Sequence, residues 1–162
     1  METFRVGFGY DVHAFANDRS LWLGGIQVPY EKGLKGHSDA DVVIHAICDA
    51  LLGAANLRDI GYHFPDTSGD FENIDSKVLL RRTMGLIRAG NYRPGNIDVT
   101  ICAEKPKLHS FIPQMKTCLA EVMNIGEGDL SLKATTSERM GFVGREEGIA
   151  VFAVALLFKP NE

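Results

Sequence analysis

Three side chains in the sequence, those of Asp11, His13 and His45, are of the types that bind a divalent metal ion. Asp11 and His13 end an alternating segment in which Phe8 and Tyr10 point the other way, because alternate residues of a β-strand share one face. His45 follows a turn-rich segment and lies on the first turns of a predicted helix. One carboxylate and two imidazoles suit zinc, and three protein ligands leave one coordination position open, as in catalytic zinc sites.

A predicted helix over residues 39–54 places Asp41, His45 and Asp49 on one stripe, because residues four apart share a helical face. Either Asp41 or Asp49 is then expected to hold the second ring nitrogen of His45, since metal-bound histidines usually have such a partner. The competing interpretation is that the stripe is simply a polar helix face, and the spacing alone leaves both open.

A second group of polar side chains follows a predicted strand, in the segment 132–142. Thr135 and Glu138 have the spacing of a helix capping box. The functional alternative is a grip on phosphate and metal, in which threonine hydroxyls and backbone N–H groups donate to phosphate oxygens and Glu138 binds a hard cation such as Mg2+. Lys107 would add positive charge, or it belongs to an ordinary turn. Arg145 stands beside acidic residues and is either a surface ion pair or an anion-binding group.

The composition is that of one globular domain, here 1–162, with 45% hydrophobic and 23% charged residues. The net charge of -4 gives no electrostatic reason to expect nucleic acid, and no dense Lys/Arg run indicates a membrane surface. The three cysteines are odd in number and lie in apolar segments, which is typical of reduced thiols in a cytosolic protein. The sequence shows no targeting segment and no apolar run near 18 residues, so we expect a soluble cytoplasmic protein.

The elements that must position these side chains can be predicted from periodicity and from breaker residues. Ser38 or Asp39 is the expected N-cap of the first helix, and Gly24-Gly25 marks a hairpin turn. The predicted strands are 4–14, 21–29, 97–103, 130–135 and 149–158, and the predicted helices are 39–54, 75–89 and 112–124.

Two of the remaining segments carry further expectations. The polar stretch 59–73 has no periodicity, and so long a loop is either a tolerated surface excursion or functional. The strand 149–158 is apolar throughout, which predicts burial on both faces, either under helices or in a subunit interface.

Taken in order and with their spacing, the motifs of this chain resemble those of the 2-C-methyl-D-erythritol 2,4-cyclodiphosphate synthase family. The resemblance covers nearly the whole chain. It is carried by Asp11-Val12-His13, Gly36-His37-Ser38-Asp39-Ala40-Asp41, Asp59-Ile60-Gly61, Pro106-Lys107, Lys133-Ala134-Thr135-Thr136 and Gly141-Phe142-x-Gly144-Arg145.

The resemblance implies a lyase of non-mevalonate isoprenoid biosynthesis, which converts 4-diphosphocytidyl-2-C-methyl-D-erythritol 2-phosphate to the 2,4-cyclodiphosphate and CMP. It implies that Asp11, His13 and His45 bind Zn2+ or another divalent transition metal, and that Glu138 binds Mg2+ or Mn2+. Lys107 and Thr136 would complete the catalytic set. The implied substrate-binding residues are His37, Ser38, Asp59, Gly61, Ala103, Leu108, Ala134, Thr135, Phe142 and Arg145.

The implied fold is α+β, with a mixed four-stranded sheet, helices on one face, a protruding β-hairpin, and assembly into a homotrimer with active sites between subunits. Two alternatives stay open, a zinc-dependent phosphohydrolase and a non-enzymatic binder of isoprenoid diphosphates. The binder would use Phe142 and Arg145 around a channel on the trimer axis, where Tyr10 makes the surroundings more polar than the phenylalanine common in relatives.

Overall fold

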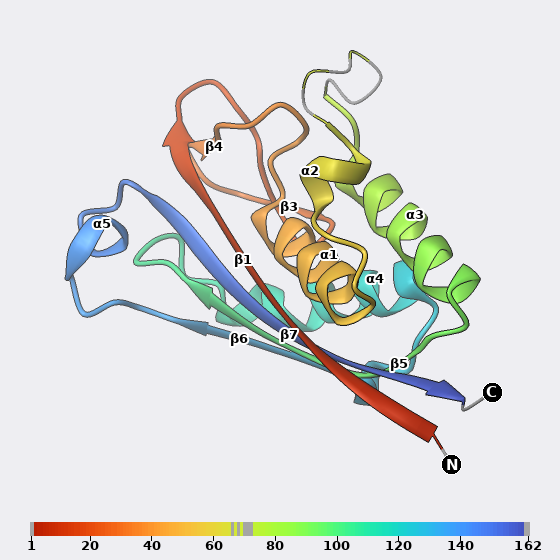
Figure 1. The fold of residues 1–162 in the computed structure, drawn as a ribbon. Helices are drawn as coiled ribbons and strands as arrows, with labels where there is room; N and C mark the ends of the chain where they lie inside the picture. The colour runs from red at the N-terminus through yellow and green to blue at the C-terminus, as the bar shows by residue number, and fades with distance from the viewer. Residues whose placement is uncertain (1, 66, 68, 70–72, 161–162) are drawn as a thin grey trace.

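A mixed five-stranded β-sheet forms the body of the protein, and its strand order is β4-β1-β7-β5-β6 (Figure 1). The structure, a computed structural model, describes residues 2–65, 67, 69 and 73–160. β5 and β6 are parallel, and every other neighbouring pair is antiparallel. The strands are β1 (Glu2–Ala16), β4 (Gly33–Leu34), β5 (Arg93–Cys102), β6 (Leu130–Thr135) and β7 (Gly148–Pro160), and a separate hairpin pairs β2 (Leu21–Leu23) with β3 (Ile26–Val28).

Helices cover one face of this sheet, as predicted (Figure 1). The long helix α1 packs on β1 and β7, α3 lies beside it, and α4 contacts α3 and β6. The buried core lies in this layer and includes Ile44, Leu51, Met84 and Val151. The helices are α1 (Val42–Ala54), α2 (Ile60–His63), α3 (Ser76–Ala89), α4 (Ile112–Met123) and α5 (Gly141–Gly144), with short 3-10 turns η2 (His109–Phe111) and η3 (Glu127–Asp129).

The other face of the sheet is apolar and exposed along β1 and β7. Even-numbered residues of β1 point to this side, and Phe4 and Phe8 are 70% and 63% exposed. Their partners across the ladder are apolar as well: Tyr10 pairs with Phe152, and Phe8 with Val154. In the isolated chain, β7 is therefore buried only on its helix side, although its sequence predicts burial on both faces.

The sheet has one more strand than the sequence predicts. β4 pairs with the end of β1 through only two residues, Gly33 and Leu34, which is too short for a periodic pattern. β5 begins at Arg93, four residues before the predicted strand, and its register with β7 shifts between Pro94 and Asn96.

The hairpin turn falls on the predicted glycines. Gly24 and Gly25 both have positive φ, as the two central residues of a tight type I′ turn require. The turn packs against α4, because a side chain on Gly24 would meet Met115. The protruding arrangement of a hairpin stays a prediction.

The predicted loop 59–73 contains the short helix α2, and residues 66, 68 and 70–72 lie outside the described part. Among the described residues, no helix has the length and apolar character needed to span a membrane.

Candidate functional site

Two glycines allow helix α1 to approach β1 closely, and this brings the predicted metal ligands together. Gly7 and Gly9 face the helix, where a Cβ on either residue would overlap the carbonyl oxygen of Ala50 or Ala46. Glycine is the residue that permits such close backbone contact. His45, next to Ala46 on the helix, therefore reaches the same side of β1 as Asp11.

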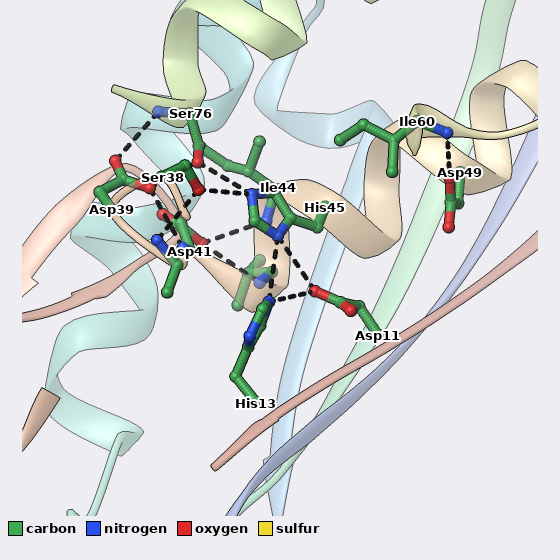
Figure 2. A network of polar contacts seen from close by, with 12 residues as sticks. Asp11, His13, Ser38, Asp39, Asp41, Ile44, His45, Asp49, Ile60 and Ser76 are labelled. Carbon is green, nitrogen blue, oxygen red and sulfur yellow. Dashed lines mark hydrogen bonds and ion pairs between the residues drawn. The ribbon is translucent and has the colours of Figure 1, made fainter. Parts of the chain in front are cut away.

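The ligand atoms of Asp11, His13 and His45 form a nearly equilateral triangle (Figure 2). Asp11 Oδ2 lies 3.0 Å from His13 Nε2 and 3.1 Å from His45 Nδ1, and the two nitrogens are 3.3 Å apart. Ligands on a tetrahedral ion with bonds of about 2.0–2.2 Å are separated by roughly 3.3–3.6 Å. The triangle is thus close to the size that zinc requires, and a small expansion would accommodate the ion.

His13 is held in the orientation that a metal ligand needs. Its Nδ1 lies 2.7 Å from the carbonyl oxygen of Lys35. Because a carbonyl only accepts hydrogen bonds, Nδ1 donates, and Nε2 is left to face Asp11.

The predicted hydrogen-bond partner of the second ring nitrogen of His45 was wrong. Neither Asp41 nor Asp49 contacts its second nitrogen; instead Nε2 lies 3.2 Å from Ser38 Oγ and 3.1 Å from Ser76 Oγ (Figure 2). Asp41, not Ser38 or Asp39, is the N-cap of α1, so it precedes the helix and does not share its stripe.

Asp41 and Asp49 bind backbone instead. Asp41 is fully buried and accepts from the backbone N–H groups of Gly24 and Gly25 as well as from the first turn of α1. Burial raises the pKa of Asp41. Asp49 accepts from the N–H of Ile60 at 2.7 Å and so ties α1 to α2.

The charges at the triangle favour a bound cation. Burial acts to raise the pKa of Asp11, but hydrogen bonds and charge interactions with His13 and His45 outweigh it and lower the pKa to about 2. Burial also acts to lower the pKa of His13, but the hydrogen bond and the charge of Asp11 outweigh it and raise that pKa. Asp11 is therefore ionised at neutral pH, as a metal ligand must be.

A cavity of about 280 Å³ opens beside this triangle. Three further predicted residues, His37, Ser38 and Gly61, line it together with His13 and His45. Asp59 is not among the lining residues; it is the N-cap of α2, immediately before Ile60.

A larger cavity, of about 540 Å³, lies at the carboxyl ends of the parallel strands β5 and β6 and beside the start of α4. The structure brings six predicted residues together here, although 25 residues separate the two segments that supply them. They are Ala103, Lys107, Leu108, Ala134, Thr135 and Thr136.

The two cavities are on different parts of the sheet. Asp11 and His13 are on β1, whereas Thr135 ends β6, and both β7 and β5 lie between these strands. Neighbouring strands are about 4.8 Å apart, so roughly 14 Å separates β1 from β6. The linings of the two cavities share no residue, and none of Asp11, His13 and His45 lines the larger one.

Comparisons with known proteins match one family over nearly the whole chain. The YgbB family model matches residues 4–158. The 2-C-methyl-D-erythritol 2,4-cyclodiphosphate synthase of Parabacteroides distasonis is 66% identical over 94% of this chain and 95% of its own length. The chain belongs to the 2-C-methyl-D-erythritol 2,4-cyclodiphosphate synthase family. The predicted family, function and enzyme class, a lyase, are confirmed.

Solved structures of the family have the same fold. The bifunctional IspDF from Campylobacter jejuni is similar with a TM-score of 0.95 and 40% identity over 99% of this chain, which spans 44% of that longer protein. IspF of Plasmodium falciparum in a CDP complex is similar with a TM-score of 0.85 and 34% identity, over 98% of this chain and 97% of that one.

The loop after β6 contains the remaining predicted catalytic residues. Thr136 Oγ1 donates to Glu138 Oε1 at 3.0 Å. The capping-box interpretation is wrong, because Glu138 has a positive φ of 54° and α5 begins only at Gly141, with Met140 as N-cap.

Glu104 organises this loop, and the sequence reasoning missed it. Its Oε1 accepts from the N–H groups of Ser137 and Arg139, at 3.0 and 3.1 Å. These bonds lower the pKa of Glu104, and the bond from the Arg139 N–H has the larger effect. A carboxylate two residues before the Pro106 turn had no local pattern that would have singled it out.

Phe142 and Arg145 lie away from both cavities. Phe142 is half-buried on α5, and the exposed Arg145 forms an ion pair with Glu147 at 2.7 Å. This is the surface ion pair that the sequence left as one of two alternatives. Their predicted role around a trimer-axis channel stays a prediction.

Proposed function

We propose that the enzyme closes the ring by letting the substrate attack itself. The 2-phosphate of 4-diphosphocytidyl-2-C-methyl-D-erythritol 2-phosphate attacks the β-phosphorus, and CMP leaves. The attacking oxygen is already anionic, so no protein nucleophile or strong base is required, and the enzyme has to position the phosphates and offset their charge. The observation that carries this proposal is the pair of donor sets: a metal triangle beside one cavity, and hydroxyls with a lysine beside the other.

The triangle of Asp11, His13 and His45 is the proposed Zn2+ site, with another divalent transition metal as a substitute. When bound, the ion supplies a Lewis acid and a template at the β-phosphate. The protein fixes the three ligand atoms, and His37 and Ser38 line the adjoining cavity from which the phosphates would approach. The spacing of the ligand atoms and the ionised Asp11 support this assignment.

The larger cavity is the proposed site for the cytidine diphosphate moiety. Ala103 and Leu108 are buried apolar residues of the cavity wall. The exposed Lys107 can offset negative charge on the leaving phosphate. Thr135 and Thr136 supply hydroxyl donors, and Glu138 would hold Mg2+ or Mn2+ together with substrate phosphates, since Mg2+ is often bound through one carboxylate. The CDP complex of the Plasmodium falciparum relative supports a nucleotide in this family.

We further propose a cytoplasmic homotrimer whose sites lie between subunits. The separation of the two cavities on the sheet supports this, because a neighbouring chain would have to supply the second half of each site. The exposed apolar face of β1 and β7 supplies the contact surface, since contiguous apolar patches of this kind mark protein interfaces. The cysteines are unpaired, which fits a reducing compartment.

Changing Phe8 to glutamate is expected to dissociate the assembly. A charge at this position would be buried without a partner in the interface, which costs far more than an exposed charge. Light scattering coupled to size exclusion should give about three times the 17.8 kDa chain mass for the wild type and a single chain for Phe8→Glu.

The control is Tyr62→Glu, which places the same charge on another exposed aromatic residue, 57% exposed on α2. It should stay trimeric. A Phe8→Glu protein that also stays trimeric would exclude this sheet face as the interface.

The proposed reaction is tested by incubating the protein with the diphosphocytidyl substrate and following products by mass spectrometry, with and without a chelator. We expect equal amounts of CMP and cyclodiphosphate, and loss of both when the metal is removed. Release of inorganic phosphate in place of the cyclic product would instead identify the phosphohydrolase.

A further inference from the structure

The turn between β6 and α5 has an unfavourable backbone conformation (Figure 1). Glu138 and Arg139 have positive φ values of 54° and 62°, and the N–H of Met140 donates to the carbonyl oxygen of Ser137 at 3.0 Å. Two central residues with positive φ are what a type I′ turn requires, and glycine or asparagine normally occupies such positions. With larger side chains this conformation persists only where surrounding contacts hold it.

Glu104 supplies such contacts to the Ser137–Met140 turn. Its Oε1 accepts from the N–H groups of Ser137 and Arg139, one on either side of Glu138 in the chain, and Ser137 Oγ lies 3.3 Å from the same oxygen. Hydrogen bonds to a carboxylate are among the stronger ones in proteins. A second contact comes from α5, because a Cβ on Gly144 would overlap the carbonyl carbon of Arg139.

The turn sets the positions of two residues that are proposed to act on the substrate. Thr136 lines the larger cavity, and its Oγ1 donates to Glu138 Oε1 at 3.0 Å and lies 3.4 Å from the N–H of Glu138. Any movement of the turn therefore moves both side chains. Glu104 directly follows Ala103 and precedes Lys107 by three residues, so it joins the two chain segments that line this cavity.

We propose that Glu104 is a positioning residue for the ring-closing reaction. It holds the Ser137–Met140 turn and thereby keeps Thr136 and Glu138 in place for the diphosphate of the substrate. This inference rests on the proposed function of the larger cavity. Glu104 is not among the residues that line the cavity, and it acts through the backbone of the turn. All three of its bonds end on one oxygen, so the role needs an acceptor at that place rather than a negative charge.

Glu104→Gln and Glu104→Ala distinguish the acceptor from the charge. Glutamine has the same length and keeps one carbonyl oxygen that can accept from both N–H groups, although charge-assisted bonds are roughly twice as strong as neutral ones. Alanine removes the acceptor, and a misplacement of about 1 Å can cost roughly 100-fold in rate. We therefore expect kcat/KM for CMP release to fall by about 100-fold in Glu104→Ala and by less than about tenfold in Glu104→Gln.

Two further measurements follow the turn and the cavity without turnover. Amide hydrogen exchange at Ser137 and Arg139 is read by NMR on 15N-labelled protein without substrate. Exchange should be faster by roughly tenfold or more in Glu104→Ala, because the acceptor of both N–H groups is lost, and should change less in Glu104→Gln. Calorimetry with CDP in Mg2+ buffer should show an affinity lower by about tenfold or more in Glu104→Ala. Circular dichroism checks that each variant is folded.

Glu127→Ala is the matched control. Glu127 is exposed on η3 and accepts from Thr117 Oγ1 at 2.8 Å, but it does not line the larger cavity. This variant loses a carboxylate and a hydrogen bond of the same kind, and it should keep the wild-type kcat/KM and CDP affinity.

Wild-type exchange and turnover in Glu104→Ala would overturn the inference, and so would a Glu104→Gln variant as impaired as Glu104→Ala. A wild type that binds no CDP and releases no CMP would overturn the proposed function and the catalytic part of this inference with it. Faster exchange in Glu104→Ala would then still show that Glu104 holds the turn.

Discussion

His45→Ala abolishes formation of CMP and cyclodiphosphate while the fold stays intact. His45 supplies one of three ligand atoms, and Asp11 and His13 alone form an incomplete site. The charge stabilisation that a metal supplies in such a site amounts to several kcal/mol, so we expect turnover to fall by roughly 10³-fold or more. Product formation is followed by mass spectrometry, zinc content by elemental analysis, and secondary structure by circular dichroism.

His63→Ala is the control for losing an imidazole. His63 lies on α2 and bonds to the carbonyl oxygen of Leu57, and it lines neither of the two cavities. This variant should keep its zinc and its turnover. CMP release at the wild-type rate from His45→Ala in chelator-treated buffer would rule out the metal triangle as the catalytic centre.

Gly9→Ala is expected to destabilise the protein and to separate the residues of the metal triangle. The new Cβ would overlap the carbonyl oxygen of Ala46 and lie 2.7 Å from the backbone nitrogen of Ala50. Backbone atoms of a helix cannot rotate away, so α1 must move off β1. Overpacking of this kind costs about 1–3 kcal/mol or more, and the same movement pulls His45 from Asp11. Urea unfolding measures the first effect and zinc competition the second.

Gly85→Ala is expected to change stability in the opposite direction. Gly85 is an exposed residue in the middle of α3, and a Cβ there has no neighbour within 4 Å. Alanine in a helix interior is favoured over glycine by roughly 0.5–1 kcal/mol, so this variant should be more stable than the wild type and bind zinc normally. Equal stability of Gly9→Ala and the wild type would show that the close contact between α1 and β1 is not needed.

The sequence predicted which side chains gather at the candidate metal site better than it predicted their surroundings. Asp11 and His13 could be placed on one strand face because the two-residue period of a strand is strict. The partner of His45 could not be found, since it comes from Ser76, 31 residues away, and Asp75-Ser76 has only the local pattern of an ordinary helix start. Local periodicity does not specify which elements meet.

The same limit applies to the fold. The long strands and the helices had apolar patterns of sufficient length, so their positions were predicted to within a few residues. β4 was missed because two residues cannot show a period, and the first helix begins at Val42 because Asp41 uses its side chain to cap. Six of the residues that line the larger cavity were predicted, and only through the family resemblance, because no local pattern joins Ala103 to Ala134.

The pairing of β1 with β7 has a consequence for the synthesis of the protein. Asp11 is opposite Val151, and Glu2 is opposite Pro160, so the first strand of the sheet in sequence order pairs along most of its length with the last one. At about 5–20 residues per second, roughly 7 to 26 seconds pass between the end of β1 and the start of β7. During that time the strand that contains Phe4 and Phe8 cannot pair with β7. We therefore expect a nascent chain of this enzyme to expose the apolar residues of β1 to chaperones until β7 has been made.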